Sequence, residues 1–119
     1  MGENLEVAKW SLESALKMLD ALPSGGIPLD ERRDIRIKIQ MGLNALTQNE
    51  KAIWLKTKKG KDILTEFHEA SAKLKDTVER FDDETSSKFL EGVKAALMDV
   101  ETGTKKINEE TRRRSMVVT

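Results

Sequence analysis

The chain has 119 residues, of which 21 are Lys or Arg and 21 are Asp or Glu, so its formal net charge is zero. This length fits one domain with one hydrophobic core, and it is too short for a catalytic domain with a second binding domain. The neutral charge argues against strong, unselective binding to nucleic acid. With 35% charged and 4% aromatic residues, the composition favours long solvated helices over a β-sandwich.

The absence of cysteine excludes disulfides, thiolate catalysis and zinc–thiolate sites. The uncharged runs are far shorter than the roughly 18 apolar residues that a membrane span needs. We therefore expect a cytoplasmic protein that has no membrane partner.

The first predicted helix covers residues 3–22. Its apolar residues recur every three or four positions and share one helical face, which consists of Leu5, Ala8, Leu12, Ala15, Leu19 and Leu22. The Pro-Ser-Gly-Gly sequence at 23–26 ends this helix, because Pro lacks an amide donor and Gly is costly to order. Trp10 lies off the apolar face, so we expect it to be exposed and able to anchor a partner.

Residues 30–58 are predicted to form the second helix, either unbroken or divided in two where Thr47-Gln48-Asn49 can bend or break it. Their pattern is also ambiguous between helix and strand. Asp30 can cap the start of a helix, and Gly60 follows a lysine cluster that suits a helix end. From Ile35 to Leu43, apolar residues occupy every second position, which is also the pattern of a half-buried strand. The alternative fold is therefore α+β, with a small three-stranded meander around residues 34–66.

As a helix, residues 30–58 carry two apolar stripes. The first stripe consists of Ile35, Ile39, Leu43, Leu46 and Ile53, and the second of Ile37, Met41, Ala45, Ala52 and Leu55. An ordinary surface helix buries a single stripe. This helix therefore either lies between neighbours on both sides or presents one stripe to a partner.

Two further helices are expected. Asp62 can cap the third, whose apolar face holds Ile63, Phe67, Ala70, Leu74, Val78 and Phe81. The final helix follows a polar break at 82–86 and carries Phe89, Val93, Val100 and Ile107. Short links at 23–29, 60–61 and 82–85 predict that consecutive helices pack antiparallel. We expect an all-α, antiparallel bundle of three to four helices over residues 1–111, followed by a basic, flexible tail over residues 112–119.

The residues offer no convincing set for catalysis or for metal binding. His68 is the only histidine, so a metal site would have to be completed by carboxylates. Ser71 lies one helical turn from His68, but nucleophilic catalysis also needs an orienting acid. We expect a non-enzymatic protein with no cofactor, no metal and no small-molecule substrate.

The favoured function is protein–protein interaction, as an adaptor, scaffold or regulatory subunit that binds a partner or a second copy through an apolar helix face. The predicted binding residues are Ile37, Met41, Trp54, Leu55 and Trp10. The alternative is a small nucleic-acid-associated protein that holds phosphates on a basic helix face, with Trp54 stacked on a base. The residues predicted for that face are Arg33, Arg36, Lys51, Lys58 and Lys59.

Overall fold

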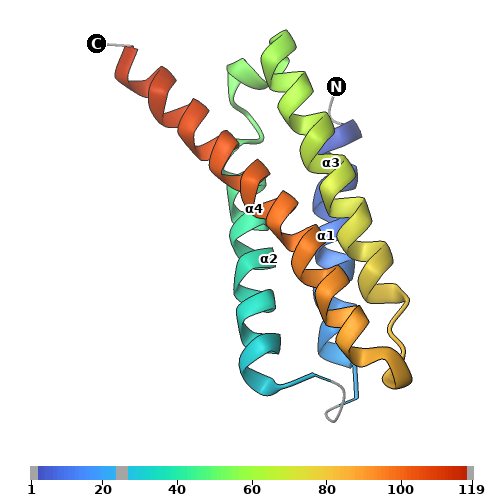
Figure 1. Ribbon diagram of the computed structural model, residues 1–119. Helices are drawn as coiled ribbons and strands as arrows, with labels where there is room; N and C mark the ends of the chain where they lie inside the picture. The colour runs from blue at the N-terminus through green and yellow to red at the C-terminus, as the bar shows by residue number, and fades with distance from the viewer. Residues whose placement is uncertain (1–2, 24–26, 118–119) are drawn as a thin grey trace.

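The computed structural model describes residues 3–23 and 27–117, which form a bundle of four α-helices. The helices are α1 (Glu3–Ala21), α2 (Leu29–Asn49), α3 (Lys58–Glu79) and α4 (Ser86–Val117), with short 3₁₀ turns η1 (Ile53–Lys56) and η2 (Asp83–Thr85). Figure 1 shows the four helices packed side by side. The predicted all-α fold is confirmed. The alternative meander is wrong, because the described ranges contain no strand and the alternating residues lie in α2.

Each helix packs against two others, because α1 and α4 both contact α2 and α3. Figure 1 shows that α1 and α2 run in opposite directions, as do α3 and α4. Between α2 and α4, Glu31 pairs with Lys94 and Lys38 pairs with Glu101, so these two helices are parallel. The consecutive helices α2 and α3 occupy opposite corners of the bundle and do not pack as neighbours, contrary to the expectation that consecutive helices pack antiparallel.

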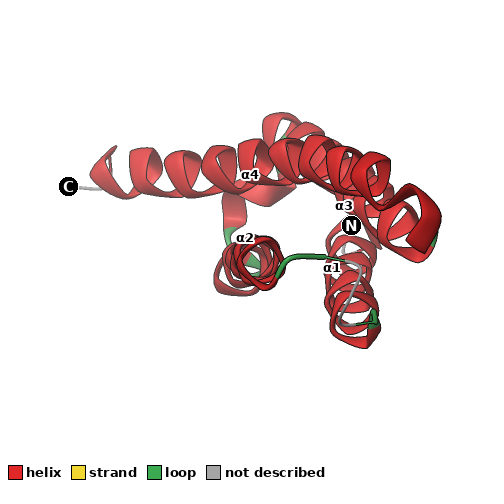
Figure 2. Cartoon of the chain, turned by 60° about the horizontal axis from the view of Figure 1, so that its bottom comes forward, coloured by secondary structure: helices red, strands yellow, loops and turns green. Residues whose placement is uncertain are grey.

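The bundle is elongated, with extents of 54 × 24 × 19 Å. One end of it holds η1 together with the starts of α1 and α3 and the ends of α2 and α4, and we call this the η1 end (Figure 1). Helix α4 has 32 residues, which corresponds to about 48 Å. Its last turns extend past α2, as Figure 2 shows.

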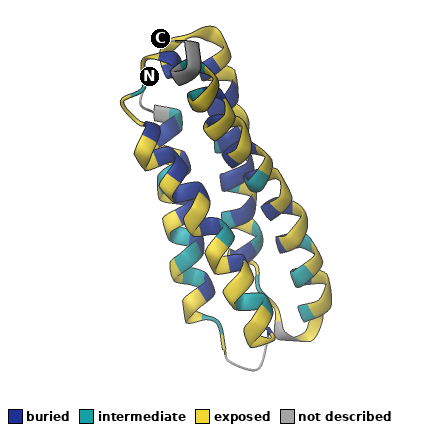
Figure 3. Ribbon diagram, turned by 90° about the vertical axis from the view of Figure 1, so that its left-hand side faces the viewer, coloured by how far each residue is buried: buried dark blue, intermediate teal, exposed yellow. Residues whose placement is uncertain are grey.

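The core is built from the apolar faces that the sequence predicts for α1, α3 and α4. Buried residues are dark blue along the ribbon in Figure 3. The ring of Phe67 on α3 is fully buried in a slot between two glycines. A Cβ added to Gly103 of α4 would lie 2.6 Å from Phe67 Cδ2, and one added to Gly42 of α2 would lie 3.4 Å from Phe67 Cζ. The two glycines therefore provide the space that the ring fills.

The second predicted helix is shorter than expected. Helix α2 ends at Asn49, whose Nδ2 donates to the Ala45 carbonyl at 2.8 Å, and Ala52 is extended. Residues 53–56 then form η1 instead of further helical turns. One unbroken helix over residues 30–58 is therefore wrong after residue 49, and the alternative of a break at Thr47-Gln48-Asn49 is confirmed.

Helix α3 begins earlier than the sequence suggested. Thr57 caps it, because its Oγ1 accepts a hydrogen bond from the Gly60 amide at 3.1 Å, so the cap is not Asp62. Gly60, predicted to follow a helix end, lies in the first turn of α3. A Cβ on Gly60 would collide with the Trp54 carbonyl oxygen and lie 2.6 Å from Leu55 Cα. Glycine is needed here because η1 folds back onto the helix start.

Glu110 holds the end of α4 in place. Its buried carboxylate accepts hydrogen bonds from Arg114 Nε at 2.8 Å and Arg113 Nη2 at 2.6 Å, and it pairs with Lys59 of α3 at 3.1 Å. The hydrogen bonds from Arg114 and Arg113 are the main reason that the pKa of Glu110 falls from 4.5 to about 2. Residues 112–117, predicted as a tail, instead continue α4 to Val117, and residues 118–119 lie outside the described ranges.

Candidate functional site

The structure separates the five residues that were predicted to bind a partner. Ile37, Met41 and Trp10 are exposed, at 59%, 55% and 57% of their surface. Trp54 and Leu55 are each only 5% exposed, because η1 turns them into the core. These two residues are too buried to contact a partner. Ile37 and Met41 remain as candidate binding residues on α2, and Trp10 is a separate candidate on α1.

The buried Trp54 joins three elements of the η1 end. Its Nε1 donates to Thr111 Oγ1 of α4 at 3.1 Å, and Thr111 Oγ1 donates to Asn49 Oδ1 of α2 at 2.7 Å. A buried indole needs such a partner for its N–H. This network accounts for Trp54 as a structural residue.

Ile37 and Met41 lie on the exposed side of α2, which carries no charge beyond Lys38. We define the α2 outer face by its exposed, uncharged residues, which are Ile37, Gln40, Met41, Asn44, Thr47 and Gln48. No charged residue occurs between Lys38 and Glu50, although charged residues make up 35% of the chain. Depletion of charge together with an exposed methionine is typical of the centre of a protein interface.

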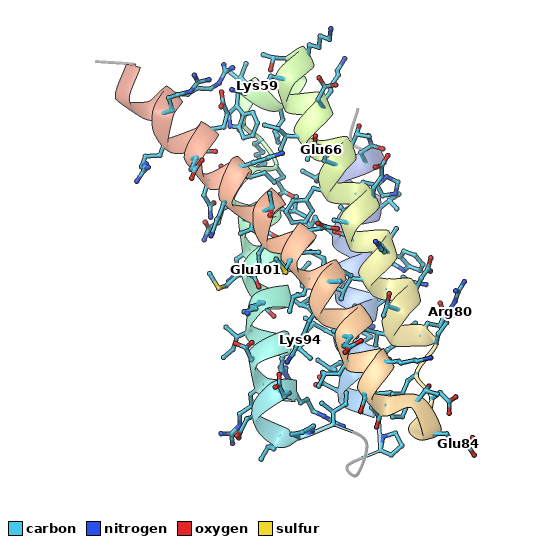
Figure 4. The ribbon with its side chains drawn as sticks, viewed as in Figure 1. Lys59, Glu66, Arg80, Glu84, Lys94 and Glu101 are labelled. Carbon is cyan, nitrogen blue, oxygen red and sulfur yellow. The ribbon has the colours of Figure 1, made fainter. Side chains whose placement is uncertain are left out.

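A groove of about 210 Å³ runs beside Met41, between α2 and α4, and is lined by Lys38, Met41, Glu101, Thr104 and Lys105. Lys38 Nζ lies 3.1 Å from Glu101 and 3.1 Å from Asp34. Figure 4 shows Glu101 and Lys94 on the part of α4 that borders α2. Hydrogen bonds with Glu101 and then with Asp34 raise the pKa of Lys38 above its ordinary value of 10.5. The α2 outer face is therefore bordered along α4 by a fixed row of charges.

Trp10 does not extend the α2 outer face. It lies on α1, where Lys75 of α3 places its Nζ 4.9 Å from the centre of the indole ring. Because α2 and α3 occupy opposite corners of the bundle, Trp10 and Met41 face different directions. One side of the indole is already covered by a cation–π contact.

Two larger grooves lie between α3 and α4, with volumes of about 430 Å³ and about 470 Å³. Charged side chains of both signs line most of them, including Asp62, Glu109 and Arg113 in the first. Glu66 and Lys106 border both grooves and pair with each other at 2.7 Å. Ligand pockets are usually apolar with a few convergent polar groups, so these grooves are weaker candidates than the α2 outer face.

His68 and Ser71 do not form a catalytic pair in this structure. His68 is half-buried on α3, while Ser71 is fully buried and its Oγ has no hydrogen-bond partner among the described residues. A hydroxyl enclosed in the core cannot reach a substrate. Within residues 3–23 and 27–117, no group of three or more His, Cys, Asp or Glu residues could hold a metal ion.

The residues predicted for nucleic-acid binding lie at two ends of the molecule. Arg33 and Arg36 are near the start of α2, whereas Lys51, Lys58 and Lys59 are at the η1 end, about 24 Å away along the helix. Arg36 pairs with Asp20 at 3.2 Å, and Lys59 pairs with Glu110 at 3.1 Å. These five residues do not form one basic face, and the buried Trp54 cannot stack on a base.

Comparison of this chain with family models, with curated proteins and with solved structures finds no match. In the part of the chain that the structure describes, no helix combines the length and the apolar character needed to cross a bilayer. The functional proposal therefore depends on the surface of this chain alone.

Helical spacing did not predict two features of the surface. Ile53, placed in the core stripe by its spacing, is 81% exposed because α2 ends at Asn49 and η1 changes the direction of the chain. The polar part of the α2 outer face was also missed. Its signal was present in the sequence as the uncharged run of residues 39–49.

Proposed function

We propose that the protein is a non-enzymatic, cytoplasmic interaction module, an adaptor, scaffold or regulatory subunit, that binds a partner protein or a second copy through the α2 outer face. The proposal depends most on one observation. Ile37 and Met41 are more than half exposed, and α2 carries no charge from residue 39 to residue 49. The absence of cysteine agrees with a reducing, intracellular compartment.

The energetics of the face suit an interface of moderate affinity. Fully burying a side chain of this size gains about 1.5–3 kcal/mol, and roughly half of that remains to be gained at Ile37 and at Met41. Their sum is smaller than the cost of association. The amides of Gln40, Asn44 and Gln48 therefore have to contribute hydrogen bonds, while the charges around Lys38 set the orientation of the partner.

The proposed function is tested by capture of partners from the native host, with the double variant Ile37→Lys, Met41→Lys as bait beside the unaltered chain. We expect the variant to lose specific partners about tenfold or more, because both substitutions place charge at the centre of the face. Ile53→Lys is the matched control, since Ile53 is an exposed isoleucine away from α2. Equal recovery of partners by all three baits would contradict the proposal.

The alternative, association with nucleic acid, has less support because its five basic residues do not converge. It predicts a different behaviour on addition of salt. Binding to phosphates weakens steeply as the salt concentration rises, whereas apolar packing does not. Filter binding of a mixed-sequence oligonucleotide over a salt series would separate the two functions.

A further inference from the structure

The exposed side of α2 has the spacing of a helix-pairing seam. Moving along the helix, Asp30, Arg33, Ile37, Met41, Asn44 and Gln48 follow one another at intervals of three or four residues. This spacing keeps one stripe facing a single partner helix over several turns. The stripe covers 19 residues, or about 27 Å of helix axis. Its natural occupant is therefore another helix that lies along α2.

Charge divides this seam into two halves. Asp30 and Arg33 lie in its first part with Asp34 beside them, whereas the second part, beyond Lys38, presents only Met41 and amides, with Thr47 at its edge. If two copies of α2 lay parallel, Asp30 would face Asp30 and Arg33 would face Arg33, which is unfavourable. If they lay antiparallel, the charged half of each helix would face the amide half of the other.

The two ends of the molecule also differ in net charge. The part toward the η1 end (residues 3–7, 42–68 and 105–117) has ten Lys and Arg against seven Asp and Glu, whereas residues 8–41 and 69–104 have eleven against fourteen. Helix α2 runs along the long axis, as Figure 1 shows. Antiparallel pairing through α2 therefore places the net-basic end of one copy beside the net-acidic end of the other, with the acidic excess carried by residues 69–104 outside the seam.

We propose that the occupant of the α2 outer face is a second copy of this chain, bound with the two α2 helices antiparallel about a two-fold axis near residue 39. This inference rests on the proposed function and names its partner. In that register, Ile37 of each copy packs on Met41 of the other. Asn44 and Gln48 come opposite Asp34 and Asp30 of the other copy, so their amides can donate to the carboxylates.

The first test is the mass of the chain in solution, measured by sedimentation equilibrium over a wide concentration range. We expect a concentration-dependent approach to twice the chain mass of 13.4 kDa. The double variant Ile37→Lys, Met41→Lys should remain a monomer, while Ile53→Lys should dimerise like the unaltered chain. Circular dichroism confirms that each variant is folded, and Met41→Lys alone provides a milder version of the same test.

The second test measures orientation. Because the chain has no cysteine, Thr47→Cys, at the edge of the face and outside the contacts of this register, provides a unique site for a spin label. An axis near residue 39 places the two labels about 24 Å apart along the helices. A parallel pair, with helix axes 8–10 Å apart, would bring them to within about 15 Å of each other.

The outcomes separate this inference from the proposed function. A monomer at every concentration, a dimer insensitive to the α2 substitutions, or a short distance between the labels would overturn the antiparallel pair. If the chain is monomeric but the α2 variant still loses its partners in the capture experiment, the proposed function stands and only the second copy is wrong. If the α2 substitutions change neither the mass in solution nor the capture of partners, the antiparallel pair and the proposed function are both wrong.

Discussion

The slot around Phe67 allows a quantitative test of the packing that positions α2. We consider Gly103→Ala, which adds a single methyl group to α4 opposite the Phe67 ring. The new Cβ would lie 2.6 Å from Phe67 Cδ2 and 3.3 Å from two further ring atoms. The ring cannot move away freely, because it is fully buried and Gly42 of α2 lies against its far edge.

Two opposing free-energy terms determine how Gly103→Ala changes the stability of the protein. Replacing Gly by Ala inside a helix gains about 1 kcal/mol in helix propensity, whereas overpacking a core costs about 1–3 kcal/mol. Because 2.6 Å is well inside van der Waals contact, we expect the overpacking term to be larger, with a net loss of about 1–2 kcal/mol in the free energy of unfolding. Gly92→Ala is the control, since its Cβ would meet only Thr77 Cγ2, at 3.2 Å.

Urea unfolding followed by far-ultraviolet circular dichroism measures both variants, and a double-mutant cycle with Phe67→Leu isolates the contact. We expect Gly92→Ala to raise the free energy of unfolding by about 0.5 kcal/mol or more. Phe67→Leu should cost at least about 1 kcal/mol less in the Gly103→Ala background than in the unaltered chain. If Gly103→Ala stabilises the protein as Gly92→Ala does, or if the cycle is additive, the slot is packed differently from this description.

Three further predictions concern the η1 end and α2. Trp54→Phe removes the hydrogen bond to Thr111 and should lower the free energy of unfolding by about 1 kcal/mol; an unchanged urea midpoint would contradict the network. The pKa of Glu110 is about 2 when folded against an ordinary 4.5, so its contribution to stability is present above pH 4.5 and is lost as the pH falls toward 2. An acid titration should therefore show Glu110→Gln losing less stability than the unaltered chain over that interval, and parallel curves would refute this. Leu55→Lys should unfold the protein or cost about 3 kcal/mol or more because Leu55 is buried, whereas Met41→Lys should change the thermal midpoint little.

The sequence predicts α1, α3 and α4 well because each carries one apolar stripe whose spacing matches a helix. In α2 the strand-like alternation was misleading, since Ile35 and Ile39 bury one face while Ile37 stays in solvent on the other. The spacing of apolar residues in α2 does favour helix over strand, because Leu46 continues the buried stripe of Ile35 and Ile39. It could not, however, decide which of the two stripes faces the core.

The polar sequence Thr47-Gln48-Asn49 marked a possible break, but the path of the chain after Asn49 could not be predicted from neighbouring residues, because residues 50–56 keep the spacing of a helix. It is fixed by contacts that are distant in the sequence. Thr111 on α4 bonds to both Asn49 and Trp54, more than fifty residues away. These contacts turn Trp54 inward and Ile53 outward, and so they reverse two of the assignments made from helical spacing.

The central claim is that the α2 outer face is a binding surface and not merely exposed apolar surface. The most direct measurement is methyl NMR of isoleucine- and methionine-labelled protein with a soluble paramagnetic agent, recorded from micromolar to millimolar protein concentration. Our account predicts that the methyl groups of Ile37 and Met41 become protected from the agent as the protein is concentrated, while Ile53 remains as accessible as before. Methyl groups of Ile37 and Met41 that stay as accessible as Ile53 throughout, in a protein that nevertheless associates, would contradict it.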